Sequence, residues 1–227
     1  MAMRLKFLGH AAFSVSATEG TVLIDPFLSD NPCAAARPEE VEAEVILVTH
    51  GHGDHLGDAV PISKRTCAPI VATFELANYC ADQGAKVIDA HFGGVVKLPM
   101  GSVKLFPAMH SSSIDCGPFL GQAASFVLSC EGKHIYHAGD TALFGDMALI
   151  SEEFQLDVAC LPIGGHYTMG IDDAVRATKL LRPRKVVPMH YGTFEVIDAD
   201  PLEFKEKVER ATATECVILE PGGSLDL

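Results

Sequence analysis

Residues 45–55 read VILVTHGHGDH, a short apolar run followed at once by a loop that contains three histidines and one aspartate. Imidazole and carboxylate groups are ligand types that zinc and neighbouring transition metals bind. Gly51 and Gly53 carry no Cβ atom, so the backbone can turn tightly and direct alternate side chains toward one point. A histidine-rich surface turn would have no reason to follow a buried strand directly. We therefore interpret residues 50–55 as a metal-binding loop.

Three further polar side chains follow strand-like segments, as the histidine loop does. His110, Asp140 and His190 each come shortly after an apolar run. Side chains at strand ends can converge at one edge of a sheet, on loops held by a rigid scaffold. Together with the histidine loop they supply enough candidate ligands for two metal ions with open positions for water or substrate. These candidates are His50, His52, Asp54, His55, His110, Asp140 and His190.

Size and charge narrow the classes of protein that the sequence can encode. A chain of 227 residues with 48% hydrophobic content suits one α/β domain spanning residues 1–227. The formal charge of −13 repels phosphate backbones, and Lys and Arg are scattered, so we expect a small-molecule substrate and no nucleic acid. No apolar stretch reaches the roughly 18 residues of a membrane helix, and the first residues do not resemble a signal peptide. We therefore expect a cytoplasmic protein without membrane contact.

The cysteines and the pattern of apolar residues add to this description. The seven cysteines form no Cys-x-x-Cys pair, which fits reduced thiols, and Cys116 in a glycine-rich loop is a weak site candidate. Runs of strands with helices between them indicate a layered α/β arrangement. Helices are predicted over residues 75–83, 171–181 and 201–210. Strands are predicted over residues 4–8, 12–16, 21–24, 45–49, 70–72, 86–88, 94–98, 103–108, 125–130, 134–138, 158–161, 185–188 and 214–219.

The order of the candidate ligands resembles the metallo-β-lactamase superfamily. The resemblance rests on His50-x-His52-x-Asp54-His55 followed by His110, Asp140 and His190, with Asp25 at the position of the superfamily's first aspartate. The flanking stretches LGHAAF (8–13), YHAGDT (136–141) and PIGGHYTMG (162–170) are similar to an uncharacterised branch of metal-dependent hydrolases related to ascorbate-6-phosphate lactonases. The likeness covers nearly the whole chain.

This resemblance implies a fold and a ligand arrangement. The expected fold is a four-layer αβ/βα sandwich, in which two mixed β-sheets are flanked by helices and the site lies at one edge. Asp25 would orient the histidine loop, and the branch suggests a homo-oligomer. Two divalent ions are expected, zinc first, although the carboxylate ligands also suit manganese or iron. One ion would be held by His50, His52 and His110, the other by Asp54, His55 and His190, with Asp140 bridging.

The resemblance also implies hydrolysis by a metal-bridged hydroxide, with a lactone or another cyclic or phosphate ester as substrate. Asp54 is a catalytic candidate because it could orient or deprotonate the attacking water. His10 and His166 are candidates for contacting substrate, the alternative being a supporting role. A sensor or scaffold without turnover and a phosphodiesterase acting on nucleotides stay open as alternatives. Specificity is expected from the loops 26–40, 111–121 and 164–170, and a structural or surface role from His91, His134 and His137.

Overall fold

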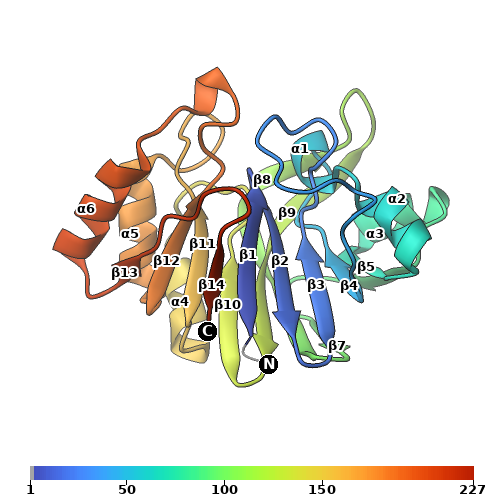
Figure 1. Ribbon diagram of the computed structural model, residues 1–227, viewed down its shortest axis with the longest axis horizontal. Helices are drawn as coiled ribbons and strands as arrows, with labels where there is room; N and C mark the ends of the chain where they lie inside the picture. The colour runs from blue at the N-terminus through green and yellow to red at the C-terminus, as the bar shows by residue number, and fades with distance from the viewer. Residues whose placement is uncertain (1–2) are drawn as a thin grey trace.

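The computed structural model describes residues 3–227 and contains two seven-stranded β-sheets that pack face to face (Figure 1). Helices cover the outer side of each sheet. Both sheets combine parallel and antiparallel pairs. The predicted four-layer αβ/βα sandwich is therefore confirmed.

The strands and helices have the following bounds, with strands given in their order across each sheet. The first sheet contains β14 (Ser224–Asp226), β1 (Arg4–Gly9), β2 (Ala12–Ala17), β3 (Gly20–Ile24), β4 (Val45–Leu47), β5 (Ile70–Thr73) and β6 (Val87–Ala90). The second contains β13 (Glu215–Cys216), β12 (Lys185–Met189), β11 (Val158–Pro162), β10 (Lys133–His137), β9 (Phe119–Cys130), β8 (Gly101–Ser113) and β7 (Val95–Leu98). The helices are α1 (Gly53–Leu56), α2 (Ala59–Thr66), α3 (Phe74–Asp82), α4 (Met147–Glu153), α5 (Ile171–Leu181), η1 (Glu195–Ile197) and α6 (Pro201–Ala211). In residues 3–227 no helix has the length and apolar character needed to span a bilayer.

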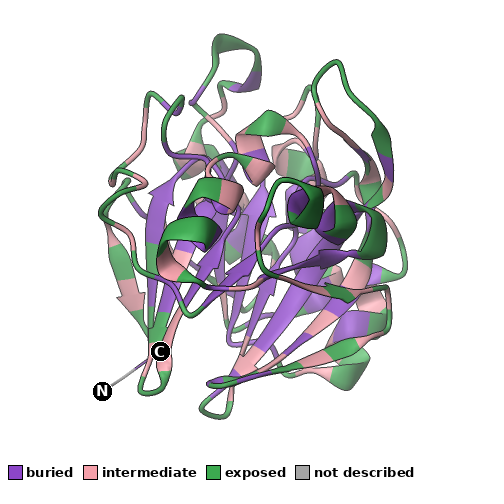
Figure 2. Cartoon of the chain, turned by 90° about the vertical axis from the view of Figure 1, so that its right-hand side faces the viewer, coloured by how far each residue is buried: buried purple, intermediate pink, exposed green. Residues whose placement is uncertain are grey.

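Alternation along the strands divides the apolar side chains between two hydrophobic clusters. Val45 and Leu47 of β4 belong to the cluster between the sheets, which also contains Phe126 of β9. Ile46 lies on the opposite face of β4, in a cluster with Ile62 of α2. Because both faces are covered, the parallel strands read as continuous apolar runs. Figure 2 shows the buried sheets and the exposed outer faces of the helices. Burial of each Leu or Ile side chain stabilises the folded state by about 1.5–3 kcal/mol. The strand ends that carry the site therefore rest on a rigid scaffold.

Several elements differ from the sequence prediction. Helices α2 and α4 were not predicted, and the predicted strand 214–219 is reduced to β13. Strands β8 and β9 continue beyond the predicted ends into the segment 111–121, which we expected to be a loop. The added residues pair through backbone hydrogen bonds, which need no apolar side chains and therefore leave little pattern in the sequence. Only residues 114–118 separate the two strands.

Candidate metal centre

Both sheets contribute ligand-type side chains to one edge of the sandwich. The first sheet supplies the turn after β4 and the short helix α1, which begins inside the histidine loop. The second sheet supplies one residue of β8 and the residues that follow β10 and β12. All seven predicted ligand residues meet here, in clusters whose ligand atoms lie within 4.8 Å of one another: His50, His52, Asp54, His55, His110, Asp140 and His190.

The first cluster consists of three imidazoles. His52 Nδ1 lies 3.1 Å from His50 Nε2 and 3.3 Å from His110 Nε2. Tetrahedral zinc with Zn–N distances near 2.0–2.1 Å places its ligand nitrogens roughly 3.3 Å apart. The two distances from His52 Nδ1 therefore match the spacing of nitrogen ligands around tetrahedral zinc.

The second cluster joins imidazoles and carboxylates. The two Asp140 carboxylate oxygens lie 3.1 Å from His55 Nε2 and 3.1 Å from His190 Nε2, and Asp54 Oδ2 lies 3.7 Å from His190 Nε2. Asp140 Oδ2 is also 3.7 Å from His110 Nε2, which belongs to the first cluster. The Asp140 carboxylate thus lies between the two clusters, where the bridging residue was expected.

Buried atoms without partners show that the donor set fits metal ions. Among the residues that the structure describes, His55 Nε2, His190 Nε2 and Asp140 Oδ1 are buried and make no hydrogen bond. A buried polar atom without a partner costs about 1–3 kcal/mol of stability. A divalent ion accepts the lone pairs that these atoms direct into the cluster. Imidazole and carboxylate donors in this arrangement suit zinc, manganese or iron.

Asp25 and Thr49 determine which ring nitrogen of two ligands carries the proton. Asp25 Oδ2 accepts hydrogen bonds from Thr49 Oγ1 at 2.6 Å and from His55 Nδ1 at 2.7 Å. Because the Thr49 hydroxyl donates to Asp25, its oxygen accepts from His50 Nδ1 at 3.0 Å. Both imidazoles therefore present an Nε2 lone pair to the clusters, as carboxylate–histidine–metal arrangements require. Asp25 orients the histidine loop as predicted, whereas the sequence analysis missed Thr49.

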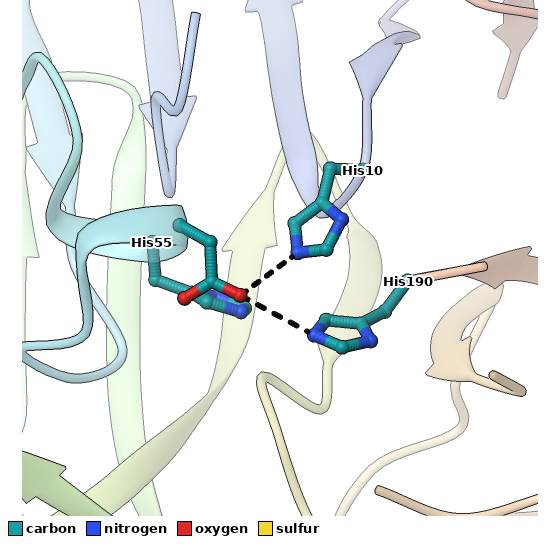
Figure 3. Close-up of side chains that lie close together, drawn as sticks. His10, His55 and His190 are labelled. Atoms are coloured by element: carbon teal, nitrogen blue, oxygen red, sulfur yellow. Dashed lines mark hydrogen bonds and ion pairs between the residues drawn. The ribbon is translucent and has the colours of Figure 1, made fainter. Parts of the chain in front are cut away.

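His10 contacts Asp54 in the same network. Figure 3 shows the His10 ring beside the rings of His55 and His190. Its Nε2 lies 3.2 Å from Asp54 Oδ2, and its Nδ1 lies 2.9 Å from Thr193 Oγ1. Burial lowers the pKa of His10 to about 4, so the ring is neutral at pH 7. A carboxylate can only accept, so His10 Nε2 carries the proton and Nδ1 accepts from the Thr193 hydroxyl. His10 therefore positions Asp54, and direct contact with substrate stays a prediction.

His166 lies elsewhere. Its side chain is exposed and does not line the cavity above the clusters; the adjacent Tyr167 does. The backbone at His166 has φ +23°. The His166 ring packs edge-on against the Tyr167 ring, with the ring centroids 4.5 Å apart. Its catalytic role stays a prediction without support from its placement. Cys116 is exposed and likewise absent from the lining. His91, His134 and His137 make structural or surface contacts, as predicted. Each forms a hydrogen bond outside the two clusters, with Phe92 N, Ser129 Oγ and Ala11 O, respectively.

The carboxylates create a negative potential in the second cluster. Burial lowers the pKa of His190, but Asp140 and Asp54 outweigh that effect and raise it to about 9. Burial opposes ionisation of Asp140, yet His55 and His190 hold its pKa well below the usual range. Burial places the pKa of His50 well below its ordinary value. Burial thus favours neutral imidazole at His50 in the first cluster, whereas the second cluster favours a cation, whether a proton or a metal ion.

A cavity of about 660 Å³ opens above the ligands. This volume lies within the range of small-molecule sites. The three loops expected to determine specificity all contribute to its wall, and the segment after β12, which the sequence analysis missed, contributes Phe194. The lining residues are Phe27, Asp30, His52, Gly53, Asp54, His110, Ser111, Asp115, Asp140, Tyr167, His190 and Phe194.

Gly139 immediately precedes Asp140, whose carboxylate lies between the two clusters. Its φ is +57°, and a Cβ atom there would lie 2.9 Å from both Ala124 O and Thr49 Cβ. We expect Gly139→Ala to lower the free energy of unfolding by about 2–3 kcal/mol, measured by urea denaturation. Gly132→Ala is the matched control, because Gly132 has φ +76° with no atom within 4 Å of the added Cβ. It should lose only about 1 kcal/mol. Equal losses in the two variants would show that crowding at Gly139 has no effect.

Known proteins similar to this chain share its length and its fold. A family model described as "Beta-lactamase superfamily domain" matches residues 4–190. A "UPF0173 metal-dependent hydrolase" of Pelotomaculum thermopropionicum is 48% identical over 229 residues, covering 99% of this chain and 100% of the relative. One from Thermococcus onnurineus is 50% identical over 230 residues, with 99% and 100% coverage. The solved structure of Igni18, a metallo hydrolase from the archaeon Ignicoccus hospitalis, is 40% identical with a TM-score of 0.92, covering 100% of this chain and 99% of that one.

Proposed function

The chain belongs to the beta-lactamase superfamily as a metal-dependent hydrolase of the UPF0173 group, and from this premise we propose that it hydrolyses a small carboxylic ester, such as a lactone, at a two-metal centre. The observation that carries this proposal is the position of Asp140. Its carboxylate lies between a cluster of three imidazoles and a second cluster that contains Asp54, His55 and His190. A shared carboxylate allows two cations to lie close together by offsetting part of their repulsion.

The protein's own groups divide the remaining work. Metal ions, when bound, supply water activation near neutral pH and polarisation of the ester carbonyl oxygen. Asp54 lines the cavity and can orient the attacking water or accept its proton. His10 donates from Nε2 to Asp54 Oδ2, which keeps that carboxylate ionised and fixes its orientation. Phe27 and Phe194 flank His10, with ring centroids at 5.7 and 5.8 Å, and limit the access of water to this hydrogen bond.

Metal analysis combined with a substrate screen tests the proposal. We expect purified protein reconstituted with zinc to hold two ions per chain, and manganese or iron to replace zinc with retention of activity. Elemental analysis gives the stoichiometry, and a panel of lactones, phosphodiesters and thioesters gives the bond that is cleaved. Lactone hydrolysis with two bound ions is the expected result. A fully loaded protein that cleaves none of these esters would instead indicate a metal-binding protein without turnover.

A further inference from the structure

The loops around the cavity carry a strongly unbalanced charge. Six segments contribute lining residues, and their sequences contain a single Lys or Arg, Arg37. Arg37 Nε lies 4.0 Å from Glu40 Oε1, and Arg37 is absent from the lining. Within residues 3–227, no Lys or Arg side chain therefore lines the cavity, and the histidines that line it belong to the ligand set. The segments are residues 25–40, 48–58, 110–122, 138–146, 163–170 and 190–200.

Two carboxylates outside the ligand set do face it. Asp30 and Asp115 line the cavity, and neither forms an ion pair or a side-chain hydrogen bond within residues 3–227. Asp115 lies against the metal-binding loop itself, because a Cβ atom on Gly53 would be 2.8 Å from Asp115 Oδ2. Its charge therefore lies beside the ligands His52 and Asp54, close to any substrate bound at the centre.

An aromatic surface forms another part of the wall. Phe27 and Phe194 lie with ring centroids 6.5 Å apart, and Tyr167 is 60% exposed at the cavity. Exposed aromatic side chains in a concave site favour contact with the apolar part of a ligand. Aromatic faces also attract cations through their quadrupole, by about 0.5–1 kcal/mol at exposed sites. Both properties favour an apolar or cationic ligand over an anionic one.

We propose that the cavity selects esters by charge: it admits cationic and uncharged esters with an apolar body, it rejects anionic ones such as phosphorylated lactones and nucleotides, and Asp115 and Asp30 make the distinction. This inference rests on the proposed ester hydrolysis and adds a substrate class to it. The positive charge of bound ions acts at the scissile group. The rest of the substrate meets the acidic and aromatic wall, where a second anionic group finds no Lys or Arg among the described lining residues.

A matched series of lactones tests this selection. The series shares one ring and one apolar substituent, which ends in a trimethylammonium, a methyl or a carboxylate group. For the wild-type protein we expect kcat/KM to fall in that order, by at least tenfold between the first and the last. Asp115→Asn should reduce the ratio of cationic to anionic kcat/KM by about tenfold, and combination with Asp30→Asn should reduce it further. The ratio should also fall as salt screens the carboxylates.

Asp82→Asn is the control, since it removes one negative charge from the exposed end of α3 without touching the cavity. It should leave the ratio unchanged. Binding of cyclic-ketone analogues with the same three end groups, measured by calorimetry, supplies a readout that does not depend on turnover. If no lactone is hydrolysed, the proposed reaction is wrong, and the order of analogue affinities still tests the charge selection. Anionic analogues that bind as tightly as cationic ones, or a ratio unmoved in Asp115→Asn, would overturn it.

Discussion

Replacement of Asp140 with alanine is expected to reduce the bound metal from two ions to one and to lower kcat by about 10³-fold, or ~4 kcal/mol of transition-state stabilisation. The reason is geometric. The carboxylate oxygens lie 3.1 Å from His55 Nε2 and from His190 Nε2, and Oδ2 lies 3.7 Å from His110 Nε2. Without this group the second ion loses a ligand, and nothing offsets its repulsion by the first. Elemental analysis and steady-state kinetics measure the two effects.

Asp140→Asn separates charge from shape. The amide keeps the volume of the side chain and one oxygen ligand but removes the negative charge that both ions would share in the proposed two-metal centre. We expect metal occupancy between that of the wild type and that of Asp140→Ala, with kcat still strongly reduced. A full complement of two ions and an unchanged rate in Asp140→Ala would contradict the bridging role.

Asp25→Asn is expected to weaken metal binding by about 10–100-fold although Asp25 faces no ion. Asp25 is fully buried and accepts hydrogen bonds from His55 Nδ1, from the Thr49 hydroxyl and from the Thr49 backbone N–H. An asparagine amide directs its NH₂ group at one of these donors, so at least one contact becomes donor against donor. His55 can then rotate or place its proton on Nε2, which removes a ligand lone pair. Competition with a chromophoric chelator measures the affinity.

Asp157→Asn provides the matched control for this variant. Asp157 is also a buried carboxylate, but it precedes β11 at the end of the sheet away from the metal centre and pairs with Lys133 and Arg184. We expect this change to lower the free energy of unfolding and to leave metal affinity intact. Equal metal affinities in the two variants would show that Asp25 acts on overall stability alone.

The ligands could be predicted from the sequence because their chemistry is local. His50, His52, Asp54 and His55 occupy one loop behind an apolar strand, and the structure brings the distant His110, Asp140 and His190 to that loop. The ends of neighbouring strands meet at one sheet edge, so a polar residue after each strand is already informative. Residue type and strand position together were sufficient to predict that these side chains meet, while their role as ligands stays a prediction.

The lining of the cavity was less predictable, because it depends on the path of each loop. His166 and Tyr167 are adjacent, yet only Tyr167 lines the cavity. The backbone turn at residues 165–169, and not the residue type, determines which of the two side chains faces the cavity. Thr49 acts through a hydroxyl that links Asp25 to His50, a contact visible only in three dimensions. Phe194 gave no sequence signal, since a lone aromatic residue in a loop has no periodic pattern.

The unpredicted helices have a similar explanation. Helix α2 contains Pro61 and ends in four polar residues, 63–66, so its apolar stripe is short. Helix α4 has seven residues, too few for a helical period to stand out. Both are stabilised by burial of a few side chains, such as Ile62 and Ile150, against the sheets. Tertiary packing decides their conformation more than local preference does.

Because both sheets contribute ligand side chains, the geometry of the metal centre depends on how the two sheets pack against each other. His50 and His55 move with the first sheet, whereas His110, Asp140 and His190 move with the second. Metal sites require their ligands to be placed within about 0.5 Å. Leu47 and Phe126 lie in the core between the sheets and are not among the ligands. A substitution that changes the side-chain volume at either residue can therefore shift the ligands and change the metal affinity. Selection for metal binding thus acts on the whole interior between the sheets, far from the residues that hold the ions.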